Sequence, residues 1–515
     1  MPDVRKRYFG CKKFGAEVNL FMQLSKSEYM MFLKHPAWLW LKKHDKGKLP
    51  LPDAALQAMF DDGHEFEKYA ERLFTDAIRV GFSYEQNNYR TMPVRTKEAI
   101  ESGAKIILQG RLEAGEITCI FDVIERVGEC EYDLYEIKSS TEVKEDHILD
   151  LAFQKIVLEK AGLKIRKTFV IHVNNKYERT GEIDIAQLTT QTEVTEQVNA
   201  HMGSTVEQIQ KALMVAYSPL PPDFSPRHVG LRALDEWMAI YEAMFPQEHP
   251  HNIFKLTHLN PLIVGELEDL GVKLIADIPE GFKLNSKQQR QVRVTKEDRR
   301  EVNKENIKEF LSKFEYPLYF FDYETFNAVI PPFDGLHPYQ QVPFQYSIHR
   351  LEQDGTMTHK EFLHTDNSHP GLPLLKQLVE DIGDKGTVLV WYEAFEKGRN
   401  DELGLMFPEY AQAMKKLNER IVDLMIPFSS GWFVDKDFFG SASIKKVFPV
   451  LISELSYEKL EIKEGGTASR TWKETYLEGK NSEQKKQIVK DLLAYCGLDT
   501  LAMVQLFEFL RTEVS

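Results

Sequence analysis

Acidic residues at three separate places in the C-terminal part of the chain have the types and order needed to cleave phosphodiesters with two metal ions. Asp322 and Glu324 lie in YFFDYETF, Glu396 lies in WYEAFEKGR, and Asp499 lies in YCGLDT. Such hydrolysis requires carboxylates from distant segments to meet around divalent cations, which activate water and stabilise the leaving oxygen. The pattern therefore predicts a site for Mg²⁺ or Mn²⁺.

The first acidic pair follows a short apolar run. Residues 318–321 are apolar and aromatic, and Pro317 precedes them, which predicts a buried strand. Residues two apart on a strand project from the same face. Asp322 and Glu324 are therefore expected to point together at a metal.

The last acidic residue belongs to a segment with helical spacing. Apolar residues recur at helical intervals over residues 488–510, and Tyr495 and Asp499 are four residues apart. We expect both side chains on one face of a helix. That face would offer a hydroxyl group and a carboxylate to one phosphate.

Several C-terminal segments together resemble a known bacterial family. They are FFDYETF, PFQYSIH, FEKGR, VDLM, GSASIKKVFP and YCGLDTLAM. The family is largely uncharacterised and fuses a RecB-like nuclease domain to a DEDD-type exonuclease domain, and the resemblance extends over most of the chain. It implies an RNase H-like 3′–5′ exonuclease fold at the C-terminus.

The second acidic motif departs from the pattern of proofreading exonucleases. That pattern ends in Asp with an Asn a few residues before it, whereas this chain has Glu396 after Phe395, and Glu393 at the earlier place. Glu is a longer ligand than Asp, so the metal geometry would differ. Asp423, in IVDLM, is the second-ranked candidate for the third ligand.

The N-terminal part carries an independent group of candidate residues. Asp122 follows an apolar stretch in TCIFDVIE, and YEIKSS places Glu136 and Lys138 two apart on a strand with Ile137 facing the other way. This D…ExK arrangement is that of restriction-type and RecB-like nucleases. It implies that Asp122 and Glu136 hold a metal, while Lys138 positions water or steadies charge on the phosphate.

Two flanking segments extend this resemblance to RecB-like nucleases. HILDLAFQKIVLEKA, residues 147–161, has the pattern of an amphipathic helix, and Gln154 matches the family's Gln after the ExK strand. In GHEFEKYAERLF, Glu67 follows Gly63 by four residues and matches a further metal ligand. His64 is a weaker candidate, since a lone His beside a charged helix is more often simply solvated.

The cysteines give no metal-binding or disulfide pattern. Cys11, Cys119, Cys130 and Cys496 are isolated and form no CxxC pair. We therefore expect free thiols in a reducing compartment. Iron–sulfur RecB-like nucleases have a later trio of cysteines that Cys11 lacks here, so no iron–sulfur cluster is expected.

The length of the chain predicts roughly two to four domains, and the resemblance implies that both nuclease domains are α/β. We expect a RecB-like PD-(D/E)xK nuclease domain over residues 1–220 and the exonuclease domain over residues 311–515. Between them, residues 221–310 form a Pro-containing linker and a small helical module that resembles a helix–hairpin–helix. The start of the chain has no apolar signal segment, and no apolar run is long enough to span a membrane, which favours a cytoplasmic protein without a membrane partner.

The net charge of −14 argues against nucleic-acid binding, because nonspecific binders usually present a basic surface to phosphate. Two local basic runs, residues 41–48 and 287–308, soften this objection. We therefore expect a DNA or RNA nuclease with two active sites. Two other classes stay open: a nucleic-acid-binding scaffold whose sites have decayed, and a phosphoesterase acting on nucleotides.

Overall fold

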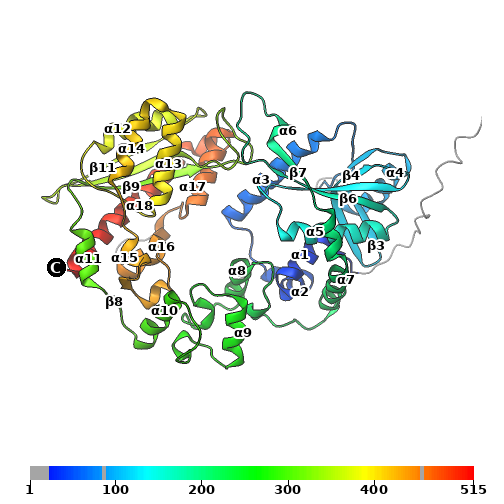
Figure 1. Ribbon diagram of the computed structural model, residues 1–515, viewed down its shortest axis with the longest axis horizontal. Coiled ribbons are helices and arrows are strands. Elements are labelled where there is room, and N and C mark those ends of the chain that lie inside the picture. Colours follow the sequence, from blue (N-terminus) through cyan, green and yellow to red (C-terminus); the bar gives the residue numbers. More distant parts are fainter. Residues whose placement is uncertain (1–21, 84–87, 453–456) are drawn as a thin grey trace, which may run out of the picture. The chain divides into compact units, whose positions relative to one another are not determined.

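The computed structural model describes residues 22–83, 88–452 and 457–515. The protein is mixed α/β with mixed sheets, so the expected coarse fold class is confirmed. The chain divides into two compact units (Figure 1). Unit 1 consists of Met1–Pro52, Met59–Gln247 and Val329–Pro338, and unit 2 of Asp53–Ala58, Glu248–Ala328 and Tyr339–Ser515. The expected middle module is thus divided between the units at residues 247 and 248.

Unit 1 contains a seven-stranded sheet with the order β2-β3-β4-β5-β6-β7, and β1 pairs with β4. Its strands are β1 (Leu24–Ser25), β2 (Ile78–Arg79), β3 (Ile106–Ala114), β4 (Ile117–Arg126), β5 (Glu131–Lys138), β6 (Lys164–Val173) and β7 (Thr189–Glu193). Its helices are α1 (Lys26–Lys34), α2 (Pro36–His44), α3 (Ala54–Ala70, which begins in unit 2), α4 (Met92–Glu101), α5 (Glu145–Lys160), α6 (Ile185–Leu188), α7 (Thr195–Tyr217) and α8 (Leu234–Met244).

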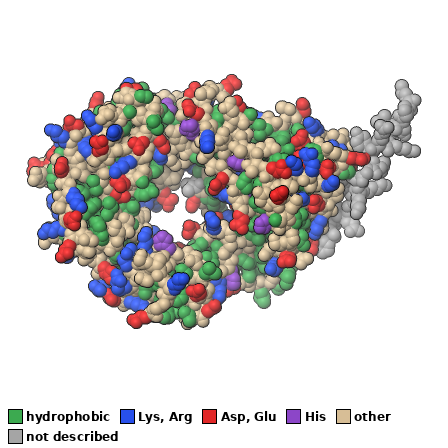
Figure 2. Space-filling view, in the orientation of Figure 1, with side chains coloured by type: hydrophobic (Ala, Val, Ile, Leu, Met, Phe, Trp, Pro, Cys, Tyr) green, Lys and Arg blue, Asp and Glu red, His purple; other side chains and the backbone are tan. Residues whose placement is uncertain are grey.

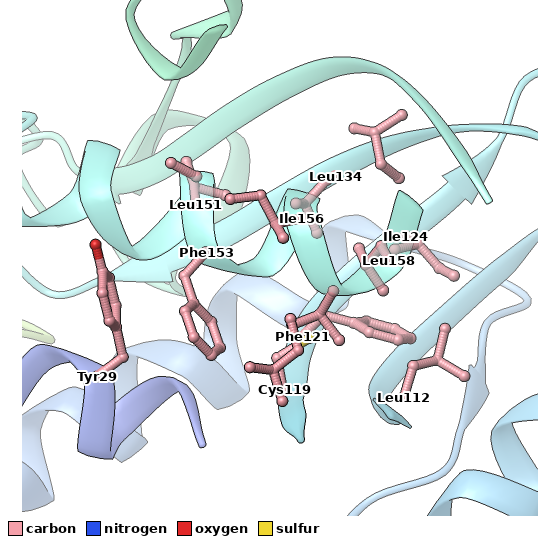
Figure 3. Packing of buried hydrophobic residues seen from close by; sticks show 14 of the residues in the cluster. Tyr29, Leu112, Cys119, Phe121, Ile124, Leu134, Leu151, Phe153, Ile156 and Leu158 are labelled. Carbon is pink, nitrogen blue, oxygen red and sulfur yellow. The ribbon is translucent and has the colours of Figure 1, made fainter. Parts of the chain in front are cut away.

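Helix α5 is the central helix of unit 1. It packs against β3, β4 and β6, while α1 and α7 pack against α5. Figure 3 shows the resulting core, in which Phe121 and Leu134 of the sheet face Leu151 and Ile156 of the helix. Most residues of α5 are buried, and these include the polar residue Gln154. A buried polar side chain requires partners, and those of Gln154 belong to the candidate site described below.

Unit 2 contains a five-stranded sheet with the order β11-β10-β9-β12-β13 and a two-stranded sheet of β8 and β14. Its strands are β8 (Glu301–Val302), β9 (Leu318–Phe326), β10 (Val342–Leu351), β11 (Met357–Leu363), β12 (Val388–Val390), β13 (Ile421–Asp423) and β14 (Phe433–Val434). Its helices are α9 (Pro261–Asp269), α10 (Ser286–Glu297), α11 (Lys304–Leu311), α12 (Gly371–Ile382), α13 (Glu393–Met406), α14 (Ala411–Arg420), α15 (Ile426–Ser429), α16 (Ile444–Leu451), α17 (Gly465–Trp472) and α18 (Lys485–Glu513).

The two faces of β9 pack against different helices. Tyr319, Phe321 and Tyr323 belong to a hydrophobic cluster with residues of α12, α13 and α14. On the other face, the ring of Phe320 lies 5.7 Å from that of Phe507 on α18, measured between centroids. Since side chains alternate along a strand, residues 322 and 324 project toward α18, and they share one face of β9 as expected from the sequence.

Helix α18 confirms the expected helix over residues 488–510. By length and composition alone, the helix over residues 482–513 could cross a membrane. However, 56% of the 18-residue apolar stretch on which this rests is buried within the protein. The helix packs against β9, β10 and β11. It therefore serves as a core helix of unit 2.

The segment expected to resemble a helix–hairpin–helix lies in unit 2. Helix α9 is followed by Gly271 at φ 74°, then by one 3₁₀ turn at Ile275–Asp277, and later by α10. Ile275 and Val292 belong to a small hydrophobic cluster that joins these elements. The expected turn between two helices is present.

Candidate metal centres

The candidate site of unit 1 forms where β4 and β5 separate. The ladder between these strands begins only at Val123 of β4. Just before it, Oδ2 of Asp122 accepts a hydrogen bond of 2.7 Å from the backbone N–H of Ile137. Glu136 and Lys138 lie on either side of Ile137 in β5. Their side chains project from the face of the strand opposite to the Ile137 side chain. The predicted D…ExK residues are therefore brought together in the structure.

Glu136 and Asp150 are bridged by two ammonium groups and one amide. Oε1 of Glu136 lies 2.7 Å from Nζ of Lys138 and 2.7 Å from Nζ of Lys26. Nε2 of Gln154 donates to Oε2 of Glu136 at 2.7 Å and to Oδ1 of Asp150 at 2.9 Å. Lys138 also donates to Oδ2 of Asp150 at 2.8 Å. All four carboxylate oxygens thus have a cationic or amide partner.

These contacts determine which groups of the site are ionised. Burial alone would raise the pKa of Glu136, but the charges of Lys138 and Lys26 outweigh it and lower that pKa. Burial and the nearby Glu136 carboxylate raise the pKa of Asp122 well above its usual value. A divalent cation would reverse this shift for Asp122. Carboxylate oxygens of Asp122 and Glu136, with the buried Oε1 of Gln154 that has no partner among the described residues, fit a hard cation such as Mg²⁺ or Mn²⁺.

Glu67 reaches the same neighbourhood from α3. A Cβ at Gly63 would lie 3.8 Å from Oγ of Ser139, so α3 passes close to the end of β5. Nε2 of Gln109, a residue with φ 53°, donates a short hydrogen bond to Oε1 of Glu67. Burial raises the pKa of Glu67, and the charge of the exposed His64 opposes that rise.

The sequence analysis did not assign Lys26 or Asp150 to this site. Lys26 is 110 residues from Glu136 and begins α1 directly after β1 pairs with β4. Three residues later, the ring of Tyr29 stacks on Phe153 with centroids 4.8 Å apart, and Figure 3 shows these two rings between α1 and α5. This packing fixes α1 against the helix that carries Asp150. Asp150 shares a helical face with Gln154, and that spacing was the available signal.

The candidate site of unit 2 is a largely buried acidic cluster between β9 and α18. Carboxylate oxygens of Asp322 and Glu324 and the sulfur of Cys496 all lie within 4.8 Å of one another. The Cys496 thiol donates to the backbone oxygen of Asp322 at 3.8 Å. Burial and the neighbouring carboxylates raise the pKa of this thiol, so it stays neutral and the carboxylates are the better metal ligands.

Asp499 and Tyr495 face this cluster from α18, as expected. Oη of Tyr457 donates to Oδ1 of Asp499 at 2.6 Å, and Nζ of Lys445 donates to Oη of Tyr495 at 3.0 Å. Burial raises the pKa of Asp499 to about 6, although the hydrogen bond from Tyr457 opposes the rise. Tyr457 was not expected at this site, and Lys445 lies in the GSASIKKVFP segment without a role expected from the sequence.

Glu396 and Asp423 have different surroundings. Glu396 is 2% exposed, accepts a hydrogen bond from the backbone of Tyr323, and has its Oε2 buried without a partner among the described residues. Asp423 instead accepts backbone N–H groups of Tyr392 at 3.1 Å, Glu393 at 3.3 Å and Met425 at 2.9 Å. The geometry favours Glu396 as the third metal ligand and gives Asp423 the role of capping α13.

The acidic cluster carries an unfavourable concentration of negative charge. Burial, and then the charges of neighbouring carboxylates, raise the pKa values of Asp322, Glu324 and Glu396 well above their usual range. Lys445 opposes the rise for Asp322 and Glu324. Four carboxylates, of which Asp322 is half-buried and the other three are buried, can together with one nearby ammonium group hold protons or hard divalent cations. This donor set suits Mg²⁺ or Mn²⁺.

Basic residues of unit 2 line a small cavity beside the loop that leads into α16, the helix that carries Lys445. Lys287 and Arg290 of α10, Phe428 of α15 and the loop residue Ser441 line a cavity of about 60 Å³. Trp391, which directly precedes the N-cap of α13, donates to the backbone oxygen of Ala442 in the same loop.

Over the face in Figure 2, Lys and Arg side chains are mixed with Asp and Glu. The negative net charge is therefore not a uniform feature of that surface.

The expectation of free cysteines is only partly correct. Cys119 and Cys496 are free and buried, but Cys130 is disulfide-bonded, so the expectation is wrong for that residue. Cys11 lies outside the described residues. The sequence signal was insufficient because isolated cysteines carry no information about which segments meet in space.

Comparisons with known proteins identify relatives without a described activity. Residues 319–443 match the family model "Domain of unknown function (DUF2779)". The chain is 26% identical over 216 residues to "Uncharacterized protein MG366 homolog" of Mycoplasma pneumoniae, which covers 38% of this chain and 32% of that protein. It is 23% identical over 212 residues to "Uncharacterized protein MG366" of Mycoplasma genitalium, with 37% and 32% covered. The matched region is thus about a third of each relative's length.

One solved structure shows a limited likeness. It is described as "Crystal structure of SSO0001", with 11% identity and a TM-score of 0.20 over 40% of this chain and 81% of that one. A likeness at this level carries no argument about fold.

Proposed function

We propose that this protein is a metal-dependent nuclease with two active sites, one in each unit, that hydrolyses phosphodiester bonds of DNA or RNA. In this proposal, unit 1 has a PD-(D/E)xK nuclease fold and unit 2 an RNase H-like exonuclease fold that trims 3′ ends. The protein would act in the cytoplasm. The observation that carries the proposal is the convergence of Asp322, Glu324, Glu396 and Asp499 from three distant segments in one cluster, in which Asp322 is half-buried and the other three are buried.

The roles in unit 2 follow from the contacts of each group. Asp322, Glu324, Glu396 and Asp499 would hold divalent cations, which supply the activation of water and the stabilisation of the leaving oxygen. Tyr457 orients Asp499 through its 2.6 Å hydrogen bond. Lys445 and Tyr495, joined by a hydrogen bond of 3.0 Å, present an ammonium group and a hydroxyl group to a phosphate.

The roles in unit 1 follow in the same way. Asp122, Glu136 and Glu67 would hold the metal, and the Ile137 amide keeps Asp122 oriented toward the end of β5. Lys138, held by Asp150 and Glu136, is placed to steady negative charge on a phosphate. Gln154 fixes Glu136 through its amide N–H.

The proposal is tested with end-labelled single- and double-stranded DNA and RNA, each in Mg²⁺, Mn²⁺ or EDTA. We expect shortening from the 3′ end that needs a divalent cation and stops in EDTA. Binding without cleavage would support a scaffold with decayed sites. Hydrolysis of nucleotides or small phosphate esters, with polynucleotides left intact, would indicate a phosphoesterase. Either result would overturn the proposed nuclease activity.

A further inference from the structure

The candidate site of unit 1 already contains two positive charges. Nζ of Lys26 lies 2.7 Å from Oε1 of Glu136 and 3.6 Å from Oδ1 of Asp150. Nζ of Lys138 lies 2.7 Å from the same oxygen of Glu136 and 2.8 Å from Oδ2 of Asp150. Two ammonium groups thus meet on one oxygen of a carboxylate that the proposed function assigns to metal binding.

The charges of these four side chains balance. Glu136 and Asp150 each carry one negative charge, and Lys26 and Lys138 each carry one positive charge, so the group is neutral without any added ion. In two-metal sites the ions lie about 3.5–4 Å apart and share a bridging ligand. Here an ammonium group of the chain already occupies such a shared oxygen, and a second divalent ion beside it would be repelled.

Lys26 is held at this position by several independent contacts. The Ser25 side chain and Glu28 form a capping box at the start of α1, and Oε1 of Glu28 is 2.7 Å from Nζ of Lys43. Tyr29 stacks on Phe153 of α5. The Lys26 side chain is only 19% exposed. Because its backbone is fixed and most of its stem is buried, little further entropy is lost when its ammonium group is held at Glu136.

We infer that Lys26 takes the place of one of two metal ions, so that the site of unit 1 binds a single divalent cation, on the side of Asp122. The inference rests on the proposed function of unit 1. It assigns the second positive charge at the phosphate to the Lys26 ammonium group. Asp122 remains available for the metal, because the Ile137 amide is its only hydrogen-bond partner within the described part of the chain.

The test counts Mn²⁺ ions bound to the 515-residue chain. The background carries Asp322→Asn and Asp499→Asn, which weaken metal binding in unit 2. Equilibrium dialysis gives the number of ions, and electron paramagnetic resonance detects the spin coupling of two Mn²⁺ ions a few ångströms apart. Lys26→Gln removes the charge at similar length, and Lys26→Arg keeps it. Thermal unfolding of each variant shows whether it is folded.

With Lys26 or Arg at this position we expect one uncoupled Mn²⁺, and with Gln we expect a second, coupled ion. Two coupled ions with Lys26 intact would overturn the inference, yet leave the proposed metal-dependent function standing. A single bound ion both in the protein with Lys26 and in the Lys26→Gln variant would show that Lys26 does not limit the number of ions. That result would also overturn the inference. No bound Mn²⁺ in any of them would refute the proposed function of unit 1 itself. The count for the intact site does not depend on any Lys26 variant folding.

Discussion

The Asp423 carboxylate holds Tyr392 in a backbone conformation that tyrosine rarely adopts. Oδ1 of Asp423 accepts the N–H of Tyr392 at 3.1 Å, while Tyr392 lies at φ 85° and ψ 75°. Tyr392 is the N-cap of α13, the helix that carries Glu396 in its first turn. A strained residue persists where its surroundings determine its conformation. Asp423 therefore positions α13, and with it Glu396.

Asp423→Ala should destabilise unit 2 by roughly 2 kcal/mol, because three backbone N–H groups lose their acceptor. Asp423→Asn keeps one acceptor oxygen and should therefore destabilise unit 2 less than Asp423→Ala. Chemical denaturation of both variants measures the difference. If Asp423 were instead the third metal ligand, Asp423→Asn would abolish metal-induced stabilisation and leave the unfolding free energy in EDTA unchanged.

Glu396→Gln should increase the unfolding free energy of unit 2 in EDTA. The substitution keeps the shape of the side chain and removes a buried carboxyl group whose ionised form is disfavoured by burial and by Asp322. The same variant should lose most of the stabilisation that Mn²⁺ gives the unsubstituted protein. Glu393→Gln, on the same helix but paired with Lys397 at the surface, is the matched control and should change little. A Glu396→Gln protein that gains as much from Mn²⁺ as the unsubstituted one would exclude Glu396 as a ligand.

The stability of unit 2 without metal should decrease as the pH rises from about 4 to 6. The pKa of Asp499 is raised to about 6 in the folded protein, above an ordinary unfolded value of about 3.9. The folded state therefore binds more protons than the unfolded state in this window, and stability is lost as the pH rises through it. Asp322 and Glu324, whose pKa values are also raised, extend the trend toward higher pH.

Divalent metal should reverse this trend, because its ligands bind as carboxylates. The increase in melting temperature on adding Mg²⁺ should therefore be larger at pH 7.5 than at pH 5. Melting temperatures measured across this range in EDTA and in Mg²⁺ provide the check. Equal increases at both pH values would show that the cluster does not bind the ion.

Lys287 and Arg290 should contribute to polynucleotide binding by unit 2. Neither side chain has an ion pair among the described residues, and both line the cavity that Ser441 also borders. The double variant Lys287→Gln/Arg290→Gln should weaken binding of single-stranded oligonucleotides and reduce the slope of log affinity against log salt by about 1.4. Fluorescence anisotropy with Ca²⁺ in place of Mg²⁺ measures this. The control is Arg511→Gln, whose guanidinium group is engaged by Glu508, and an equal loss in that control would argue against a specific phosphate contact.

Local sequence patterns predicted the elements that carry the acidic residues. Alternation along residues 318–324 placed Asp322 and Glu324 on one face of β9, and helical spacing placed Tyr495 and Asp499 on one face of α18. These patterns depend on the period of a single element.

Contacts between distant segments could not be predicted in the same way. Lys26 reaches Glu136 because β1 pairs with β4 at residues 117 and 118. This part of β4 lies before residues 123–126, which pair with β5. Tyr457 reaches Asp499 across 42 residues of sequence. The capping role of Asp423 was equally hidden, since IVDLM gives no sign that the carboxylate faces the N-terminus of α13. Such contacts arise from the topology of the fold, which cannot be inferred from a single sequence.

The most direct test of the account compares 3′-end trimming by two proteins that both carry Lys138→Ala, which disables the site of unit 1. One has Asp322 intact, and the other carries Asp322→Asn. The measurement is the rate of shortening of a 5′-labelled single strand in Mn²⁺, with unfolding curves confirming that both proteins are folded. The account predicts that the first protein trims the strand and that Asp322→Asn lowers the rate at least about a hundredfold, because a metal ligand is lost. Equal rates in the two proteins would contradict the assignment of the acidic cluster as a nuclease site.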